Sequence, residues 1–357
     1  MANFKKSIKA YLRSKEKRPI SGFRIRRLGS GWHGEGFEVD YEVSGKEKSL
    51  IIRTQRPLGF SHEYASDRAK VFLLQHELSR DIPKHVRSID VLGVAPGEVV
   101  SLGRAREFYQ IVEKAEGTPY MEDLERIKKA GKLNDNDKKK ALMLSNYLVD
   151  LHRKKFKGER ELEISLRKRH LRDTVGHGEM LLGVLDTYPE KVAFSSKKET
   201  AELICKAVRF EQKARDLENK LSRMHGDFHP GNIWFKENGD FVLLDASREI
   251  WGLPADDLTA LSINYIWFAL MHRGKFDGPF KELFEIFWKN YFKKTGDRSI
   301  LSTAALFFAF RGVVVAHPIF YKNQSDQVRR KIFNFIGSAL EDKIFDFRKI
   351  DLYVSLS

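Results

Sequence analysis

The most constraining feature of the chain is a short polar loop followed by a hairpin signal. The loop carries Asp227 and Asn232 in the pattern His-x-Asp-x-x-x-x-Asn. Two apolar stretches separated by an Asn-Gly turn signal follow it, so the sequence predicts a β-hairpin over residues 233–244. Such a hairpin would place Asn232 beside Asp245, with Asp227 at the mouth of the loop. Oxygen-bearing side chains that face one point are what a magnesium–phosphate centre requires, because Mg²⁺ prefers hard oxygen ligands.

The same segment resembles the catalytic loop and metal-binding aspartate of protein-kinase-like enzymes. The form His-Gly-Asp-Phe-His-Pro-Gly-Asn, residues 225–232, is similar to the aminoglycoside phosphotransferase and choline kinase branch rather than to the protein kinases. Residues 254–258, Pro-Ala-Asp-Asp-Leu, resemble the Pro-x-x-Asp-Leu of that branch. The resemblance implies an α+β, bilobal protein-kinase-like fold, with a small, mostly antiparallel β N-lobe and a larger helical C-lobe containing inserted helices.

The resemblance also implies roles for individual residues. It makes Asp227 the catalytic base, Asn232 and Asp245 the ligands of Mg²⁺, and Asp257 a structural brace beneath the loop. A second interpretation takes Asp227 and the loop histidines on either side of it as ligands of zinc or iron in a hydrolase. It is disfavoured because the other histidines are scattered singly, so no cluster would complete the coordination sphere.

Composition limits the class of protein. The chain has 357 residues, enough for two lobes with a sizeable core, and 42% of them are hydrophobic. Its single cysteine, Cys205, excludes a disulfide framework and fits a reducing cytoplasm. Residues 1–6 lack the apolar core of a signal peptide. The apolar run 300–321 contains Arg311 at its centre, which favours a buried helix broken near Pro318 over a membrane span. We therefore expect a soluble, cytoplasmic protein.

The net charge of +15 predicts attraction to anions. These include a nucleotide, a phosphorylated small molecule, RNA or an acidic membrane surface. Much of the charge lies within residues 152–173, where a solvated helix face explains it equally well. The sequence shows no zinc knuckle, RNA-binding sheet motif or arginine-rich repeat, so we expect no dedicated nucleic-acid module.

A glycine-rich loop lies between two strand-forming sequences near the N-terminus. Residues 4–18 predict a short basic amphipathic helix, which more often packs onto the following domain than onto a membrane. Residues 23–28 and 37–43 then alternate as strands do. Together they look like the nucleotide-covering loop of a kinase N-lobe, in which small residues let backbone N–H groups approach phosphates. The loop residues that this resemblance assigns to the nucleotide are Gly29, Ser30, Gly31 and Gly34.

One position departs from the resembled family. A third predicted strand, residues 49–53, ends where that family carries the lysine that holds the nucleotide phosphates. Here the residue is Arg53, which keeps the charge but has a larger, planar head. In the resembled family, an acidic residue pairs with this cation. Asp67, in a helix predicted over residues 64–78, has the most plausible offset to be that partner of Arg53. An acid in the first turn of a helix more commonly serves the helix dipole.

The expected hinge follows three more strands, predicted over residues 87–92, 98–102 and 107–113. Its backbone from Glu113 to Ala115 would meet the edge of adenine or guanine, so the phosphate donor would be ATP or GTP. We expect an N-terminal basic helical extension at 1–20, an N-lobe at 21–113 and a C-lobe at 114–357.

Beyond the hinge the pattern is helical, beginning with residues 141–152. The inserted segment, about 153–224, predicts helices over 171–188 and 197–224 and would shape the acceptor site in the resembled family. The region from 256 to about 346 is dense in Phe and Trp and predicts a helical core.

The resemblance implies transfer of the γ-phosphate of a Mg²⁺-bound nucleoside triphosphate to a hydroxyl of a small molecule. Only a short stretch separates Asp245 from Asp257, whereas protein substrates require a long activation segment. The basic inserted segment indicates an acceptor that is anionic or phosphorylated. Two residues leave a second class of protein open, a nucleotide-binding pseudokinase or regulatory module without turnover. One is Arg53, and the other is Ser247, at a position where some relatives carry a second acid.

Overall fold

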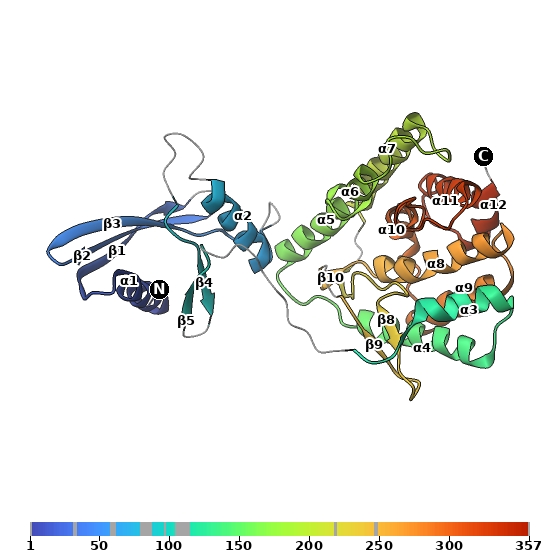
Figure 1. The fold of residues 1–357 in the computed structure, drawn as a ribbon, viewed down its shortest axis with the longest axis horizontal. Helices are drawn as coiled ribbons and strands as arrows, with labels where there is room; N and C mark the ends of the chain where they lie inside the picture. Colours follow the sequence, from blue (N-terminus) through green and yellow to red (C-terminus); the bar gives the residue numbers. More distant parts are fainter. Residues whose placement is uncertain are drawn as a thin grey trace. The chain divides into compact units, whose positions relative to one another are not determined.

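The computed structural model describes residues 2–30, 34–57, 62–78, 88–95, 98–103, 115–217, 220–245 and 249–355. The chain divides into two compact units, Met1–Val112 and Glu113–Ser357, called unit 1 and unit 2 below. Figure 1 shows small antiparallel sheets in unit 1 and a mainly helical unit 2. The predicted α+β class, with a small β part and a larger helical part, is confirmed.

Unit 1 contains a three-stranded antiparallel sheet in the order β1-β2-β3 and a separate β4–β5 pair. The strands predicted near the glycine-rich loop, and the helix after them, are confirmed within a few residues. The elements are α1 (Ala2–Glu16), β1 (Ile20–Ser30), β2 (Glu35–Val43), β3 (Lys46–Arg53), α2 (Ala65–Leu78), β4 (Leu92–Ala95) and β5 (Glu98–Ser101).

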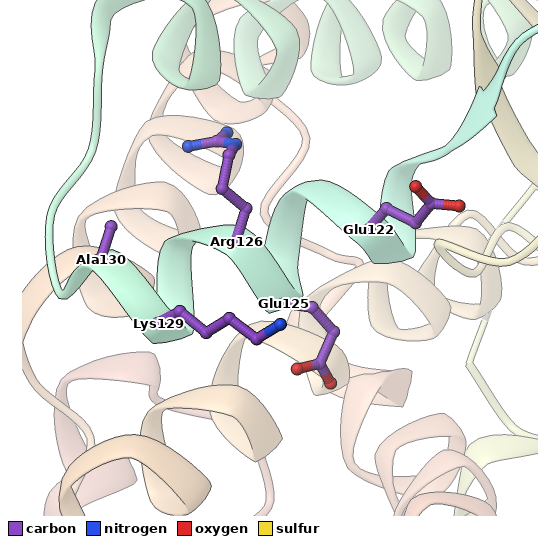
Figure 2. A pocket seen from close by; sticks show the side chains of 5 residues that line it. All are labelled: Glu122, Glu125, Arg126, Lys129 and Ala130. Carbon is purple, nitrogen blue, oxygen red and sulfur yellow. The ribbon is translucent and has the colours of Figure 1, made fainter.

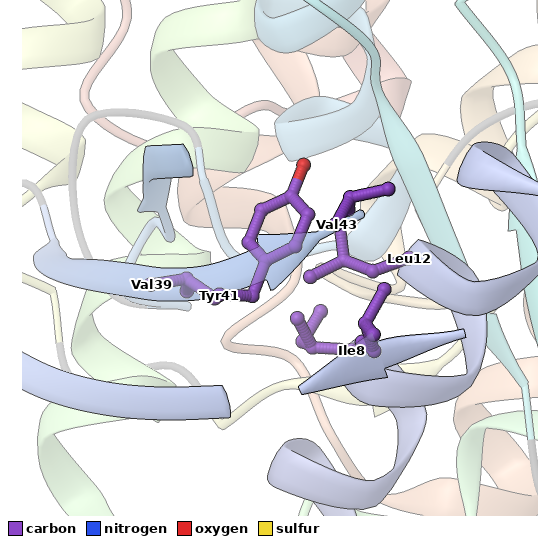
Figure 3. Packing of buried hydrophobic residues seen from close by; sticks show 6 residues of the cluster. Ile8, Leu12, Val39, Tyr41 and Val43 are labelled. Atoms are coloured by element: carbon purple, nitrogen blue, oxygen red, sulfur yellow. The ribbon is translucent and has the colours of Figure 1, made fainter. Parts of the chain in front are cut away.

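The core of unit 1 lies between α1 and the three-stranded sheet (Figure 3). Ile8 and Leu12, four residues apart on one face of α1, are buried against Val39, Tyr41 and Val43. These three residues alternate along β2, so they all point to the same face of the sheet. The basic helix therefore packs onto the sheet that follows it.

The strand predicted over residues 87–92 is wrong for residues 88–91, which form no strand. The physical reason is Asp90, whose carboxylate collects hydrogen bonds from side chains and backbone. It accepts them from Tyr11 Oη (2.6 Å), Ser101 Oγ (2.9 Å) and the N–H of Gly103 (3.2 Å). Such side-chain bonding holds an irregular segment instead of a ladder. The strand predicted over 107–113 lies outside the described residues.

Unit 2 is built from helices and a few very short strands. The first half comprises β6 (Thr118–Pro119), α3 (Tyr120–Ala130), α4 (Asp135–His152), α5 (Arg160–Gly176), α6 (Leu181–Asp186), α7 (Lys197–Ala214), β7 (Ser222–Arg223) and β8 (Ile233–Phe235). The second half comprises β9 (Phe241–Leu243), β10 (Trp251–Gly252), α8 (Ala255–Arg273), α9 (Gly278–Thr295), α10 (Leu301–Val315), α11 (Asp326–Ala339), the 3₁₀ helix η1 (Phe347–Lys349) and α12 (Ile350–Ser355).

The core of unit 2 is centred on α8, which is buried on every side from Ala255 to Leu270. A helix that is apolar all round belongs inside a protein, and α8 packs against α9 and α10 (Figure 1). The run 300–321 forms the buried helix α10, which ends just before His317-Pro318, as predicted. In the part of the chain that the structure describes, no helix is both long and apolar enough to span a bilayer.

The inserted segment is helical, but the helix predicted over 171–188 is wrong as a single element. It is split into the end of α5 and the short α6, with a turn closed by the N–H of Met180 on the carbonyl of His177 (3.0 Å). The turn brings the carbonyl of Gly178 so close to Gly183 that a Cβ at residue 183 would overlap it. Similarly, α7 ends at Ala214 rather than near 224, since Ser222 and Arg223 pair with β10.

Candidate functional site

The polar loop, residues 224–232, is anchored at its start by a carboxylate from α8. Asp257 lies in the first turn of α8 and is completely buried. Its two carboxylate oxygens accept the N–H groups of His225 and Gly226, both at 2.8 Å. Oδ2 also lies 3.2 Å from Nε2 of His152. This is the bracing contact that the sequence predicts for Asp257.

The partners of Asp257 favour its ionised form. Burial alone raises the pKa of this carboxyl, but the hydrogen bond with His152 and the N–H of His225 outweigh it, so the pKa lies below its usual value. His152 is held in turn, with Nδ1 2.8 Å from Oη of Tyr291. The base of the loop is therefore a fixed, ionised carboxylate in a network of satisfied polar groups.

Asp227 and Asn232 are brought together within the loop. Nδ2 of Asn232 donates to the backbone carbonyl of Asp227 (3.1 Å) and lies 3.4 Å from its Oδ2. Nε2 of His229 lies 3.7 Å from the same Oδ2. The Asp227 side chain is only 13% exposed. A carboxylate oxygen of Asp227 thus lies beside the side-chain amide of Asn232.

The hairpin after the loop is confirmed and places Asp245 near Asn232. Strands β8 and β9 pair Ile233 with Leu243, and the N–H of Leu244 donates to the carbonyl of Asn232 (2.9 Å). Asp245 follows directly, exposed, with a positive φ of 55°. Because Nδ2 of Asn232 is engaged with Asp227, its amide oxygen is the atom left for a cation. An amide oxygen and a carboxylate form a hard donor set that fits Mg²⁺.

The two histidines of the loop bind the backbone of the loop itself. Nδ1 of His225 accepts the N–H of Asp227 (3.2 Å), and Nδ1 of His229 accepts the N–H of Gly231 (3.0 Å). Both rings therefore serve the turn of the loop itself. Among the residues described, no group of three or more His, Cys, Asp or Glu side chains is arranged to hold a metal ion.

Sequence reasoning did not identify Arg311 as part of this site. This arginine of α10 is 5% exposed and forms an ion pair with Oδ1 of Asp227 through Nη1. Its Nη2 donates to the carbonyl of Gly226 (2.8 Å) and to Oδ1 of Asp256 (2.7 Å). Burial lowers the pKa of the guanidinium, but the charges of Asp256 and Asp227 raise it by more. The net pKa is therefore raised, and the guanidinium stays protonated. The available signal was a charged residue in the middle of an apolar helix.

The charge of Asp227 contributes to the pKa shifts of two further titratable groups, His229 and Tyr321. Burial lowers the pKa of His229, and Asp227 offsets this only in part, so the ring is neutral near pH 7. Burial, followed by the charge of Asp227, raises the pKa of Tyr321. The Tyr321 ring packs edge-on against Trp267, with centroids 4.6 Å apart. The neighbourhood of Asp227 therefore includes a neutral imidazole and a phenol.

The residues expected to contact the nucleotide phosphates lie in unit 1. Gly29 and Ser30 end β1, and Arg53 ends β3 as an exposed residue. Both Gly29 and Arg53 pair with Gly36 of β2, so the sheet places them on either side of that glycine. The structure thus gathers the end of the first strand and the arginine at one end of the sheet.

Other residues predicted for the nucleotide have local structural roles or are not described. A Cβ at Gly34 would overlap the backbone carbonyl of Thr54, so the chain itself requires glycine there. Asp67 accepts the N–H of Tyr64 (2.9 Å), which is the contact of a residue at a helix start. Ala115 precedes β6. The predicted residues Gly31 and Glu113, together with Ser247, lie outside the described residues.

A separate hollow of about 560 Å³ lies along α3 (Figure 2). It is lined by Glu122, Glu125, Arg126, Lys129 and Ala130. None of these belongs to the loop or to the hairpin, so the hollow is distinct from the candidate site.

No protein-family model matches the chain, and no curated protein matches it. Among solved structures, an aminoglycoside phosphotransferase in complex with ADP and hygromycin B matches 94% of this chain and 99% of its own, with 12% identity and a TM-score of 0.39. An ethanolamine kinase from Plasmodium vivax matches 93% of this chain and 80% of its own (14% identity, TM-score 0.36). A glucosamine kinase matches 90% of this chain and 93% of its own (12% identity, TM-score 0.40).

Proposed function

We propose that the protein transfers the γ-phosphate of a Mg²⁺-bound nucleoside triphosphate, ATP or GTP, to a hydroxyl group of a small molecule. The observation that carries the proposal is the pairing of Asp227 and Asn232 on a loop whose backbone is fastened by Asp257. Phosphoryl transfer requires mainly that reactants are positioned and that charge on the transferred group is neutralised. A rigid loop bearing a carboxylate and an amide supports both requirements.

Each residue has a definite part in this reaction. The acceptor oxygen attacks the γ-phosphorus, the bond from that phosphorus to the β–γ bridging oxygen breaks, and the hydroxyl proton passes to Oδ2 of Asp227. Asn232 and Asp245 would hold Mg²⁺, which supplies positive charge to the phosphates. For the donor phosphates, we assign Arg53 and the glycines near the end of β1 as the binding residues.

We propose that the acceptor is a small molecule, of a class that includes anionic molecules. The reaction takes place in the cytoplasm. The short connection from Asp245 to Asp257 supports this, because β10 and the start of α8 follow almost at once. The net charge of +15 supports an anionic ligand. Helices α5 to α7, which fill most of the inserted segment, are the elements we assign to the acceptor side.

The test is nucleoside diphosphate release with Mg²⁺ against amino alcohols, aminoglycosides, sugars and nucleosides. We expect one acceptor class to stimulate release, and Asp227→Ala to lower kcat by about 10²- to 10⁴-fold. Asp245→Asn should lose most turnover, because an amide is a weaker magnesium ligand. Asp240→Asn, an exposed carboxylate in the same hairpin, is the matched control and should behave as wild type. Equal turnover in wild type and Asp227→Ala would contradict the proposal.

A nucleotide-binding module without turnover is the alternative, and Arg53 is the residue that favours it. Arginine grips phosphate bidentately, but its fork differs in size and geometry from the ammonium of lysine. This alternative predicts a rise in thermal stability with Mg²⁺-nucleotide and no release with any acceptor. Turnover that Asp227→Ala abolishes excludes it.

A further inference from the structure

Arg311 binds only one of the two carboxylate oxygens of the candidate base. Its Nη1 engages Oδ1 of Asp227, whereas Oδ2 remains on the side of Asn232 and His229. The carboxylate therefore has one oxygen paired with a buried cation, whereas its other oxygen lies close to Asn232 and His229. An unrestrained aspartate rotates about χ2 and presents either oxygen, because this torsion is broad and roughly two-fold.

The arginine is itself held from a second direction. Its Nη2 donates to Asp256 of α8 (2.7 Å) and to the carbonyl of Gly226 (2.8 Å). Asp256 is completely buried, and α10 packs along α8. The guanidinium thus fixes three groups at once: the candidate base, the backbone just before it and the core helix beneath. A lysine ammonium, as a single point donor, does not reproduce this planar fork.

We infer that Arg311 is a positioning residue, which holds Asp227 through Oδ1 and so fixes the orientation in which its carboxylate meets the acceptor hydroxyl. This inference rests on the proposed function. Because Arg311 is only 5% exposed, it would act through Asp227 rather than by contacting the nucleotide or the acceptor. Its loss should therefore lower kcat and leave the KM values nearly unchanged, since a reacting group displaced by about 1 Å can cost on the order of 10²-fold in rate.

The principal test is a double-mutant cycle measured by steady-state kinetics. Removing Arg311 alone leaves the buried Asp256 and the largely buried Asp227 without the arginine, so Arg311→Met is combined with Asp256→Asn to keep the fold. In this background we expect kcat to fall about 10- to 100-fold, with KM for acceptor and nucleotide within about 3-fold of wild type. Arg311→Lys, which keeps the charge without the fork, should be intermediate. Thermal unfolding of each variant shows that it is folded.

The cycle partner is Asp227→Asn. If Arg311 acts through Asp227, the Arg311→Met/Asp256→Asn change costs no further kcat once Asp227 is replaced. An equal loss in both backgrounds, or a loss confined to KM, overturns the inference and leaves the phosphotransferase intact. By contrast, a wild-type protein whose turnover is the same as that of Asp227→Asn overturns the proposed function itself, and the inference with it.

Discussion

At the scale of single residues, Asp257 anchors the start of the loop. Both of its oxygens accept backbone N–H groups, and it also contacts His152. An asparagine at this position offers one acceptor oxygen, and its NH₂ group would meet a second N–H donor. Polar groups that are buried and left unsatisfied are costly.

We therefore expect Asp257→Asn to lower the free energy of unfolding by about 3 kcal/mol at neutral pH. Because the pKa of Asp257 is lowered in the folded state, its stabilisation is fully present above the unfolded pKa, about 4. It is lost as pH falls through the folded pKa. Urea unfolding of both proteins from pH 7 to pH 3 should show the difference shrinking below about pH 4.

The control for this pH series is Asp150→Asn, which replaces an exposed carboxylate on α4. Its free energy of unfolding should lie within about 0.5 kcal/mol of that of wild type. A difference between wild type and Asp257→Asn that stays constant down to pH 3 would show that the charge of Asp257 does not support the loop.

At the scale of elements, the turn between α5 and α6 depends on a glycine. The carbonyl of Gly178 occupies the space that a Cβ at Gly183 would fill, and this carbonyl is backbone, which cannot rotate away. We expect Gly183→Ala to destabilise the protein by about 1–3 kcal/mol. Gly176→Ala is the matched control, since a Cβ there meets nothing within 4 Å. Thermal unfolding of the two variants measures the difference, and equal midpoints would refute the expectation.

Local signals predicted some elements and not others. The hairpin carries its own turn chemistry: Gly239 has a φ of 84°, and Asn238 Oδ1 accepts the N–H of Asp240. The α5–α6 break depends on a contact between two glycines, which a helical pattern of apolar residues does not reveal. Arg311 lies far along the chain from Asp227, so only the packing of α10 beside the loop shows that they form a pair. Periodicity gives local structure, whereas the partners of buried charges require the tertiary fold.

At the scale of the whole molecule, each unit has its own apolar core. Leu12 of α1 is 1% exposed and packs against the sheet of unit 1. We expect Leu12→Ala to lower the free energy of unfolding by about 2–5 kcal/mol, because it leaves a cavity beneath the helix. Hydrogen exchange should speed up in β1 to β3 and remain unchanged in α8 and α10, whose core is separate.

The control in the same unit is Leu74→Ala on α2, since Leu74 is 50% exposed. It should leave exchange in β1 to β3 close to wild type. Faster exchange in α8 and α10 after Leu12→Ala would mean that the two units unfold as one.

The backbone at Asp245 has a consequence for how this protein can change. Its φ of 55° is a conformation that glycine adopts freely and aspartate adopts at a cost of about 1 kcal/mol. Selection for heat resistance alone would therefore favour glycine at this position. Selection for turnover would favour the carboxylate, if it binds the cation as we propose. The two pressures oppose each other at one residue, so a lineage released from catalysis would gain stability by losing the aspartate.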